Sequence, residues 1–517
     1  MDLLQSAWMF VRQGDGGLAW ISPFQIGESA WHDLHAPRPD FRGALYQFLI
    51  GLLQTAYAPQ DNRAWRERWA NPPSAAELEA AFAPYRDAFV LEGDGPAFMQ
   101  DLQLPADANQ LPVLNLLIDA GSDSNQFFNK PADHGLCASC FTQALLTLQL
   151  NAPPGGRGTR TSLRGGGPLT TLLVPAGERA TLWQRLWLNV LPVDALGYPK
   201  VKNRGDVLPW LQPTRTSDAA GVGDTTPETV HPLQAYWSMP RRIRLDDSTA
   251  GQGDCTLCGA GDVRLVRHYR TRYGGTNYTG AWVHPLTPYS LDAKGEKPPL
   301  SIKGQRGGIA YRHWLGLTLG NEDKQPEAAR VVRHFTRNIK RPAVRLWCFG
   351  YDMDNMKARC WYDSTLPVHA LEDDDLQKSF AHSAKQLLDV ASDTAKLLHQ
   401  QVKAAWFKRP GDTGSEPAIA QSFWQRSEAE FYGLLEQLSA CDLESPAALA
   451  SLYRRWLLRT RSLALELFDE WAMAAPIEDL NLERVTKARA GLGKELNNAK
   501  AMKALWKTVN SQLKERA

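Results

Sequence analysis

The chain has 517 residues, of which 43% are hydrophobic and 22% are charged. Its 58 Lys and Arg nearly balance 56 Asp and Glu, and the formal net charge of +2 excludes a uniformly basic nucleic-acid coat protein and a highly charged disordered chain. At roughly 100–200 residues per domain, this length predicts two to four domains.

The amino-terminal residues do not have the pattern of a targeting segment. Asp2 lies close to the start, and no long apolar run follows it, so we expect no signal peptide. No stretch reaches the roughly 18 consecutive apolar residues of a transmembrane helix. Seven cysteines, an odd and sparse set, favour a reducing compartment over secretion. We therefore expect a cytoplasmic protein without a membrane partner.

Residues 1–370 predict one large α+β domain, because short strand-like and helical patterns alternate with Pro- and Gly-rich turns. Strand-like runs occupy Leu169–Val174, Val263–Tyr269 and Val344–Cys348, and helical patterns occupy Phe41–Ala56, Ser74–Phe82 and Phe141–Leu150.

Two CxxC motifs lie within this domain, at Cys137–Cys140 and Cys255–Cys258. The two-residue spacer lets both thiolates of a motif face one ion, and two motifs complete the tetrahedral four-sulfur set that suits Zn²⁺. Such a site is closed, which indicates a structural zinc that joins two distant segments. A redox CxxC is the main alternative, and it requires a thioredoxin-like context that the flanking sequence does not show.

The stretch Asn151–Pro168 contains six glycines, three arginines and no acidic residue. Glycine permits close backbone approach, and arginine contacts phosphates or enters a minor groove. No GK[ST] follows, so the stretch is not a Walker phosphate-binding loop. A plain flexible hairpin loop is the alternative.

Residues 371–517 predict a four-helix bundle. Apolar residues recur every three or four positions in four segments, and Ser445-Pro446 has the pattern of an N-cap followed by proline at the first helical position. The four segments are Leu376–Leu398, Ile419–Leu438, Leu449–Trp471 and Val485–Leu513.

Positive charge is concentrated locally. Residues 134–177 contain no Asp or Glu, and residues 262–312 and 481–517 each contain nine Lys and Arg against three Asp and Glu. This distribution is typical of a protein that grips a polyanion in a groove, and a solvated helix face is the alternative for the last segment.

Catalytic motifs are weak. His32, Asp33, His35 and Asp40 match no strong metal template, and the sequence contains no HExxH or GxSxG. We therefore expect no enzymatic activity. A metal-dependent nuclease or hydrolase is a third hypothesis, which requires an open metal site.

Several motifs together resemble the CasA family, the large subunit of the type I-E CRISPR surveillance complex Cascade. The resemblance runs through the whole chain, and its most specific parts are the paired CxxC motifs and Ser162-Leu-Arg-Gly-Gly-Gly-Pro-Leu-Thr-Thr171. Further matches are Leu3-Leu4 with Trp8, Pro96–Gln100, Gly280–Pro285 and Leu346–Tyr351.

The resemblance implies a non-enzymatic subunit with a mixed amino-terminal domain and a carboxy-terminal four-helix bundle. Its implied partners are the crRNA-bound Cascade subunits, double-stranded target DNA and a helicase-nuclease. Its implied role is to read the protospacer-adjacent motif (PAM) from the minor groove, to promote duplex opening and R-loop formation, and to recruit the nuclease.

The resemblance also implies the sites. The glycine-rich minor-groove loop corresponds to Gly155, Gly156, Arg157 and Gly158, with Arg160 beside it, and the basic finger corresponds to Arg272, with Arg270 one alternate residue away. A wedge that splits the first base pairs corresponds to Met353–Met356, in which Asp354, Asn355 and Met356 are the candidate contacts and Asp354 departs from the family pattern. The anchor to the crRNA-handle end corresponds to Phe127, Phe128, Asn129 and Lys130.

One alternative function stays open at this point. A zinc-stapled nucleic-acid-binding protein outside CRISPR immunity would have the same two CxxC motifs and basic segments, and only association with a crRNA complex separates the two.

Overall fold

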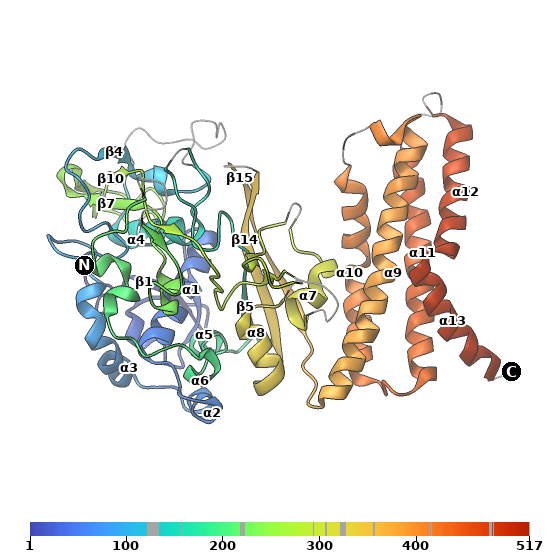
Figure 1. Ribbon diagram of the computed structural model, residues 1–517, viewed down its shortest axis with the longest axis horizontal. Helices are drawn as coiled ribbons and strands as arrows, with labels where there is room; N and C mark the ends of the chain where they lie inside the picture. The colour runs from blue at the N-terminus through green and yellow to red at the C-terminus, as the bar shows by residue number, and fades with distance from the viewer. Residues whose placement is uncertain are drawn as a thin grey trace. The chain divides into compact units, whose positions relative to one another are not determined.

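The chain divides into two compact units in a computed structural model. The first unit comprises residues 1–308 and 320–365, and the second comprises residues 309–319 and 366–517. The first mixes helices with small sheets and the second is helical, which confirms the predicted α+β class (Figure 1). The structure describes residues 1–517 except 121–133, 157, 218–222, 293, 306–307, 321–326, 355–356, 413, 415, 475–477, 479 and 516–517.

The first unit is built around one buried helix, α1 (Pro39–Ala56), which begins with proline at its first position. The Phe48 ring makes edge-on contacts with Trp8, Phe89, Phe98 and Trp237, at centroid distances of 5.5 to 6.0 Å. Large aromatic side chains supply much apolar area per residue, and many of the tryptophans of the chain are used in this core.

The other helices of the first unit are short. The three predicted helices are confirmed within three residues at their ends, and the hydroxyl of Ser74 caps α3 by accepting a hydrogen bond from the Glu77 amide at 3.2 Å. The helices that follow α1 are α2 (Asn62–Ala70), α3 (Ala75–Phe82), α4 (Ala138–Asn151), α5 (Leu182–Trp187), α6 (Val193–Leu196) and α8 (Arg330–His334).

The strands of the first unit form several small sheets. The three-stranded sheets have the orders β2-β1-β3, β4-β10-β7 and β15-β14-β5. The bounds of these strands are β1 (Met9–Gln13), β2 (Leu18–Ile21), β3 (Trp31–His35), β4 (Asn109–Pro112), β5 (Thr170–Pro175), β7 (Arg242–Asp246), β10 (His268–Arg272), β14 (Val344–Asp354) and β15 (Lys357–Val368). Two-stranded pairs join β6 (Asp224–Thr225) to β11 (Asn277–Tyr278), β8 (Gly251–Gly253) to β9 (Val263–Leu265) and β12 (Tyr289–Ser290) to β13 (Leu300–Ser301).

The predicted strand Val263–Tyr269 is two strands rather than one. Its first part is β9, which pairs with β8, and its second part belongs to β10, which pairs with β4 and β7. Val266, between them, makes an isolated bridge to Leu136. The strand-like pattern is continuous in the sequence, but its two ends pair with different strands, and periodicity alone does not reveal this.

The second unit contains the predicted bundle, with its fourth helix divided in two. The long helices are α9 (Asp374–Trp406), α10 (Pro417–Ala440) and α11 (Pro446–Ala472), followed by α12 (Leu482–Asn498) and α13 (Lys500–Glu515). Ala499 leaves the helical region, with φ −57° and ψ 140°, and the Asp393 carboxylate accepts a hydrogen bond from the Ala501 amide at 3.4 Å. As a result, α12 packs mainly on α9, and α13 packs mainly on α11.

The segment 309–319 packs with the helical unit and contains α7 (Trp314–Thr318). The Tyr311 ring stacks on Phe431 at a centroid distance of 4.3 Å, and its hydroxyl lies 2.8 Å from the Ser427 hydroxyl. The Trp314 indole donates to the Pro367 carbonyl at 2.7 Å. Among the described residues, no helix is both long and apolar enough to cross a membrane.

Candidate nucleic-acid interface

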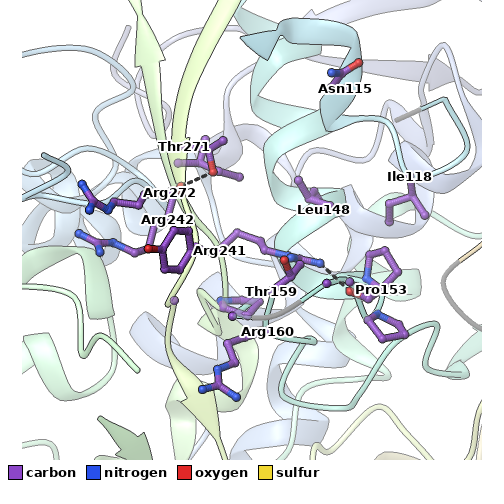
Figure 2. A pocket seen from close by; sticks show the side chains of 18 of the residues that line it. Asn115, Ile118, Leu148, Pro153, Thr159, Arg160, Arg241, Arg242, Thr271 and Arg272 are labelled. Carbon is purple, nitrogen blue, oxygen red and sulfur yellow. Dashed lines mark hydrogen bonds between the residues drawn. The ribbon is translucent and has the colours of Figure 1, made fainter. Parts of the chain in front are cut away.

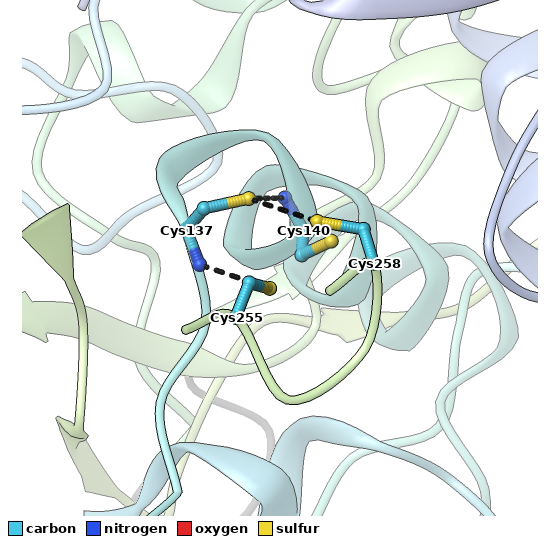
Figure 3. Close-up of side chains that lie close together, drawn as sticks. All are labelled: Cys137, Cys140, Cys255 and Cys258. Carbon is cyan, nitrogen blue, oxygen red and sulfur yellow. Dashed lines mark hydrogen bonds between the residues drawn. The ribbon is translucent and has the colours of Figure 1, made fainter. Parts of the chain in front are cut away.

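The four cysteines of the two CxxC motifs meet at one point. Their sulfur atoms all lie within 4.8 Å of one another (Figure 3). Cys137 is the N-cap of α4 and Cys140 lies in its first turn, whereas Cys255 and Cys258 lie in the turn between β8 and β9. The four thiols can therefore hold a metal ion.

Local backbone geometry brings the two motifs together. The Thr256 amide donates to the Gly135 carbonyl at 2.9 Å, which fixes the second motif beside the first. Gly259 has φ +70° and donates its amide to the Cys255 carbonyl at 3.0 Å, so the turn after the second motif uses a conformation that favours glycine. The Leu136–Val266 bridge closes the same junction.

The electrostatics of the cluster favour thiolate at two positions. Hydrogen bonds from Cys137 and Cys140 lower the pKa of Cys255, and a hydrogen bond from Cys140 lowers the pKa of Cys258 to about 7. Thiolate is the form that binds metal ions. Cys140 and Cys255 are buried and Cys258 is exposed. A metal held by all four thiolates would have the complete ligand set of a tetrahedral structural zinc site.

A cleft of about 530 Å³ in the first unit gathers three segments that are far apart in the sequence (Figure 2). We call it the glycine-loop cleft. It is lined by Gly155, Gly156, Gly158 and Arg160 from the glycine-rich stretch, by Arg272 and Tyr273 at the end of β10, and by Lys357 and Ala358 at the start of β15. Among the described residues, its charged lining residues are Arg160, Arg241, Arg242, Arg272 and Lys357 against one carboxylate, Asp119.

A main-chain contact joins the glycine loop to the end of β10. The Gly274 amide donates to the Gly158 carbonyl at 2.8 Å. Gly158 has φ +78°, and a Cβ at this position would lie 3.0 Å from the Tyr273 ring. Both the conformation and the close approach favour glycine here.

The other glycines of the loop face different surroundings. A Cβ on Gly155 would lie 2.4 Å from a Thr159 methyl carbon, whereas a Cβ on Gly156 would meet no atom within 4 Å. Gly156 is exposed, and its carbonyl accepts a hydrogen bond from the Thr159 amide at 3.0 Å. The loop therefore presents a bare backbone at Gly156.

Arg160 lines the cleft and is hydrogen-bonded to Ser217. Its Nε donates to the Ser217 hydroxyl at 2.7 Å, and a terminal nitrogen donates to the Ser217 carbonyl at 3.1 Å. Ser217 is buried and its amide donates to the Gly274 carbonyl at 3.0 Å. Arg160 therefore ties the glycine loop to residues 217 and 274 as well as adding positive charge.

Arg270 and Arg272 lie on one face of β10, directly opposite Arg244 and Arg242 on β7. Arg272 forms an ion pair with Asp107 at 2.8 Å, in which the Asp107 side chain is 76% exposed. Arg270 donates to Asp246 at 3.2 Å and to the Ala106 carbonyl at 3.1 Å. Only Arg272 of the two lines the glycine-loop cleft.

Arg241 is a cleft residue that sequence reasoning missed. Its side chain extends toward Pro153 (Figure 2) and donates to the Pro153 carbonyl at 2.5 Å. Its Nε is buried and has no hydrogen-bond partner among the described residues, and burial lowers the pKa of Arg241 to about 10. Its neighbour Arg242 also lines the cleft, but it pairs with buried Asp101 at 2.6 Å.

Met353 and Asp354 of the candidate wedge segment end β14, and Lys357, which lines the cleft, begins β15. The candidate residue Asp354, 60% exposed, pairs with Arg359 at 3.3 Å, so that its charge is partly offset. Arg359 also pairs with Asp352 at 2.6 Å. A Cβ on Gly167, which has φ +60°, would lie 2.4 Å from Met353 Cγ, and this contact packs the glycine-rich stretch against β14.

The arginine of the Ser-Leu-Arg-Gly-Gly-Gly motif does not reach the surface. Arg164 is buried and donates to the hydroxyls of Thr170 and Thr287, both at 3.0 Å, and to the Gln47 side chain at 2.7 Å. The expectation that arginines of this stretch contact phosphates is therefore wrong for Arg164. Its hydrogen bonds instead join the glycine-rich stretch to Thr170, Thr287 and Gln47.

Several candidate residues lie outside the described residues. They are Arg157 of the glycine loop, Asn355 and Met356 of the wedge segment, and Phe127, Phe128, Asn129 and Lys130 of the anchor.

The weak histidine and aspartate constellation does not form a metal site in the part of the chain that the structure describes. There, only the four cysteines form a group of three or more candidate metal ligands. Asp33 instead accepts hydrogen bonds from Arg42 and Tyr46, and Asp40 accepts from Arg38 and Tyr351.

Comparison with known proteins gives one consistent result. The family model described as CRISPR-associated protein Cse1 matches residues 2–467. A solved structure of Thermus thermophilus CasA (Cse1) is similar, with 17% identity, a TM-score of 0.69 and coverage of 96% of this chain and 99% of that chain. Thermobifida fusca Cse1 has 16% identity, a TM-score of 0.67 and coverage of 97% and 98%. A chain of a structure described as a CRISPR RNA-guided surveillance complex has 16% identity, a TM-score of 0.71 and coverage of 96% and 99%.

Proposed function

The chain belongs to the CRISPR-associated Cse1 family, also called CasA, and from this premise we propose that it is the non-catalytic large subunit of a Cascade complex that reads the PAM of double-stranded DNA. The similarity to a chain of an RNA-guided surveillance complex supports crRNA-bound Cascade subunits as its partners. Family membership argues against a zinc-stapled nucleic-acid-binding protein outside CRISPR immunity. We expect the complex to act in the cytoplasm, where free thiols such as these stay reduced.

The observation that carries the proposal is the composition of the glycine-loop cleft. The resemblance implies DNA contacts for the glycine loop, for Arg272 and for the segment around Met353–Met356, which lie far apart in the sequence. Gly155, Gly156, Gly158 and Arg272 line one cleft together with Lys357, which follows the candidate wedge directly. A single duplex bound at this cleft would therefore meet all three segments.

Physical chemistry explains why these parts suit a minor groove. The minor groove is only about 6 Å wide, so a backbone without side chains, as at Gly156, approaches its floor without a clash. Arg272 and Arg241 supply positive charge that the negative potential of the groove attracts. The groove distinguishes A·T from G·C pairs and little else, so the proposed readout is permissive.

Duplex opening follows from a small energetic bias. R-loop formation exchanges one duplex for another of similar stability, so modest protein contacts tip the balance. The tip between β14 and β15 is proposed to insert beside the PAM, where an apolar wedge unstacks the first base pairs. The anchor at Phe127–Lys130 is proposed to meet the crRNA-handle end of the complex, and recruitment of a helicase-nuclease follows from the family resemblance.

The four-cysteine cluster is proposed to hold a structural Zn²⁺. Cys137, Cys140, Cys255 and Cys258 would supply four sulfur ligands, and a complete set of four thiolates supports a structural role. The ion would join the start of α4 to the β8–β9 turn.

The proposal is tested with a complex reconstituted with and without this chain and bound to a library of duplexes with randomised PAM bases. We expect PAM-dependent binding only when the chain is present. Arg272→Ala is expected to weaken the binding of preferred PAM duplexes, while pairing of the guide with single-stranded target survives.

A matched control is available at Arg204. Arg204 pairs with exposed Asp87, as Arg272 pairs with exposed Asp107, but it does not line the glycine-loop cleft. Arg204→Ala should leave PAM preference unchanged. If Arg272→Ala and Arg204→Ala behave alike, the assignment of Arg272 is wrong, and if the chain never joins a crRNA complex, the proposed function is wrong.

A further inference from the structure

A second concave surface lies within the helical unit, between the end of α9 and α12. Its volume is about 580 Å³. We call it the basic groove and define it by Ala404, Phe407, Lys408, Lys487, Gly491 and Lys494. None of these residues belongs to the glycine-loop cleft.

The charge of the basic groove is strongly one-sided. Lys408, Lys487 and Lys494 are exposed, and Arg484 also lines the groove, against one acidic residue, Glu495, in the part of the lining that the structure describes. Glu495 accepts a hydrogen bond from the Gln401 side chain at 2.9 Å. The groove therefore carries a net positive charge that suits an anionic ligand.

Arg484 forms hydrogen bonds with the end of α9. It donates from Nε to the Ala405 carbonyl at 2.8 Å and from a terminal nitrogen to the Trp406 carbonyl at 2.9 Å. These are carbonyls at the end of α9, where the helix dipole leaves partial negative charge, so Arg484 offsets that charge. The three lysines then set the potential that a ligand meets.

The lysines are placed regularly. Lys487 and Lys494 are seven residues apart on α12, which is about two helical turns and about 10.5 Å along one face. Lys408 approaches from the segment that follows α9. Positive charge therefore lines two sides of the groove, as expected for a site that follows an extended polyanion.

Part of the groove lining is apolar. Ala404, Ala488 and Gly491 are small, and half-buried Phe407 adds an aromatic ring beside them. An aromatic ring flanked by lysines is the arrangement on which nucleic-acid bases stack while the cations contact phosphates. An acidic peptide would use the lysines but would gain little from the ring.

We propose that the basic groove binds single-stranded nucleic acid, with Phe407 as a stacking platform and Lys408, Lys487 and Lys494 as phosphate contacts. This site is separate from the glycine-loop cleft, and it does not depend on PAM recognition. The full chain is expected to bind an unstructured single strand whether or not it recognises a PAM duplex.

The test measures binding of the full chain to a fluorescently labelled oligothymidylate of about 16 nucleotides over a range of salt concentrations. If Lys487 and Lys494 each contact one phosphate, the double variant Lys487→Ala/Lys494→Ala should reduce the slope of log affinity against log salt by about 1.4, at about 0.7 for each lost contact. Phe407→Ala should weaken binding by about 5- to 150-fold, the range for loss of one stacked base.

The matched control is Lys503→Ala/Lys507→Ala, which removes the same charge from exposed positions of α13. Circular dichroism verifies that each variant keeps its helices. The proposal is wrong if the two double variants lose affinity equally, because the net charge of the unit then explains the binding. It is also wrong if oligoglutamate binds with the same lysine dependence while oligothymidylate does not, since the ligand is then an acidic protein.

The outcome is independent of the proposed function. If Lys487→Ala/Lys494→Ala loses oligothymidylate binding but keeps PAM preference, the result supports the proposal for the basic groove and does not bear on the glycine-loop cleft. Loss of PAM preference in Arg272→Ala, with normal oligothymidylate binding, concerns the glycine-loop cleft alone.

Discussion

Gly156 and Gly158, two glycines that line the cleft, should differ in how well they tolerate a side chain. At Gly156 a Cβ meets no atom within 4 Å, so Gly156→Ala should change the free energy of unfolding by no more than about 0.5 kcal/mol. At Gly158 the φ of +78° places any other residue in the left-handed region, so Gly158→Ala should cost about 1–2 kcal/mol. The contact with Tyr273 adds less, because this side chain is 59% exposed and can move.

The two positions should also separate stability from DNA recognition. Gly156→Trp fills the open space with an indole, which prevents the loop from approaching the floor of a groove about 6 Å wide. A mismatched base pair ordinarily costs about 1–3 kcal/mol, which corresponds to about 5- to 150-fold in affinity. In Gly156→Trp, the ratio of affinities for preferred and non-preferred PAM duplexes should therefore fall to nearly one. The fold should stay unchanged.

The assay combines urea denaturation of the purified chain with competition binding of the reconstituted complex to preferred and non-preferred PAM duplexes. Gly177→Trp is the control, because Gly177 is exposed, meets no atom within 4 Å and lies outside the cleft. Retention of PAM preference in Gly156→Trp would refute the reasoning about the loop. A Gly158→Ala chain as stable as the wild type would refute the reasoning about its backbone.

Three further predictions concern the metal cluster, one histidine and one arginine. Cys258→Ser should lower both the zinc content, measured by mass spectrometry, and the thermal stability, and a metal-free wild-type chain would contradict a zinc site. Burial, reinforced by the charge of Arg312, lowers the pKa of His313 to about 4. Because the unfolded state then binds more protons, stability should fall as the pH falls from about 6.5 to 4, and this loss should be smaller in His313→Gln by urea denaturation. Arg241→Met should weaken duplex binding equally for all sequences and lower the salt slope by about 0.9 if Arg241 meets one phosphate, whereas an unchanged slope would indicate that it only supports Pro153.

The sequence predicted the long helices well because their signals are local. Ser445 caps α11 by accepting a hydrogen bond from the Ala448 amide at 3.4 Å, as the Ser-Pro pattern predicted. The break at Ala499 was missed because the apolar spacing continues through Leu496, Ala499 and Met502, so that two packed helices and one longer helix give the same pattern. The inclusion of residues 309–319 in the helical unit depends on the contact of Tyr311 with Phe431, for which the sequence holds no signal.

The candidate interface was only partly accessible to sequence reasoning. The CxxC spacing predicted that four cysteines would meet, and they do. The proximity of Gly158 to Arg272 was implied by resemblance alone, since the main-chain bond from Gly274 joins segments more than one hundred residues apart. Arg241 was not distinguishable from Arg242 in the sequence. Both arginines line the cleft, and the sequence does not indicate that Arg242 pairs with Asp101 whereas Arg241 donates to the Pro153 carbonyl.

The separation of the two CxxC motifs has a consequence for the newly synthesised chain. Cys137 and Cys258 are 121 positions apart, and translation proceeds at roughly 5–20 residues per second. Cys137 and Cys140 are therefore synthesised roughly 6–24 seconds before their last partner, and during this interval their thiols are open to oxidation or to binding the wrong metal ion. Supply of metal and reductant during translation should therefore affect the yield of folded protein more than the same additions made after folding.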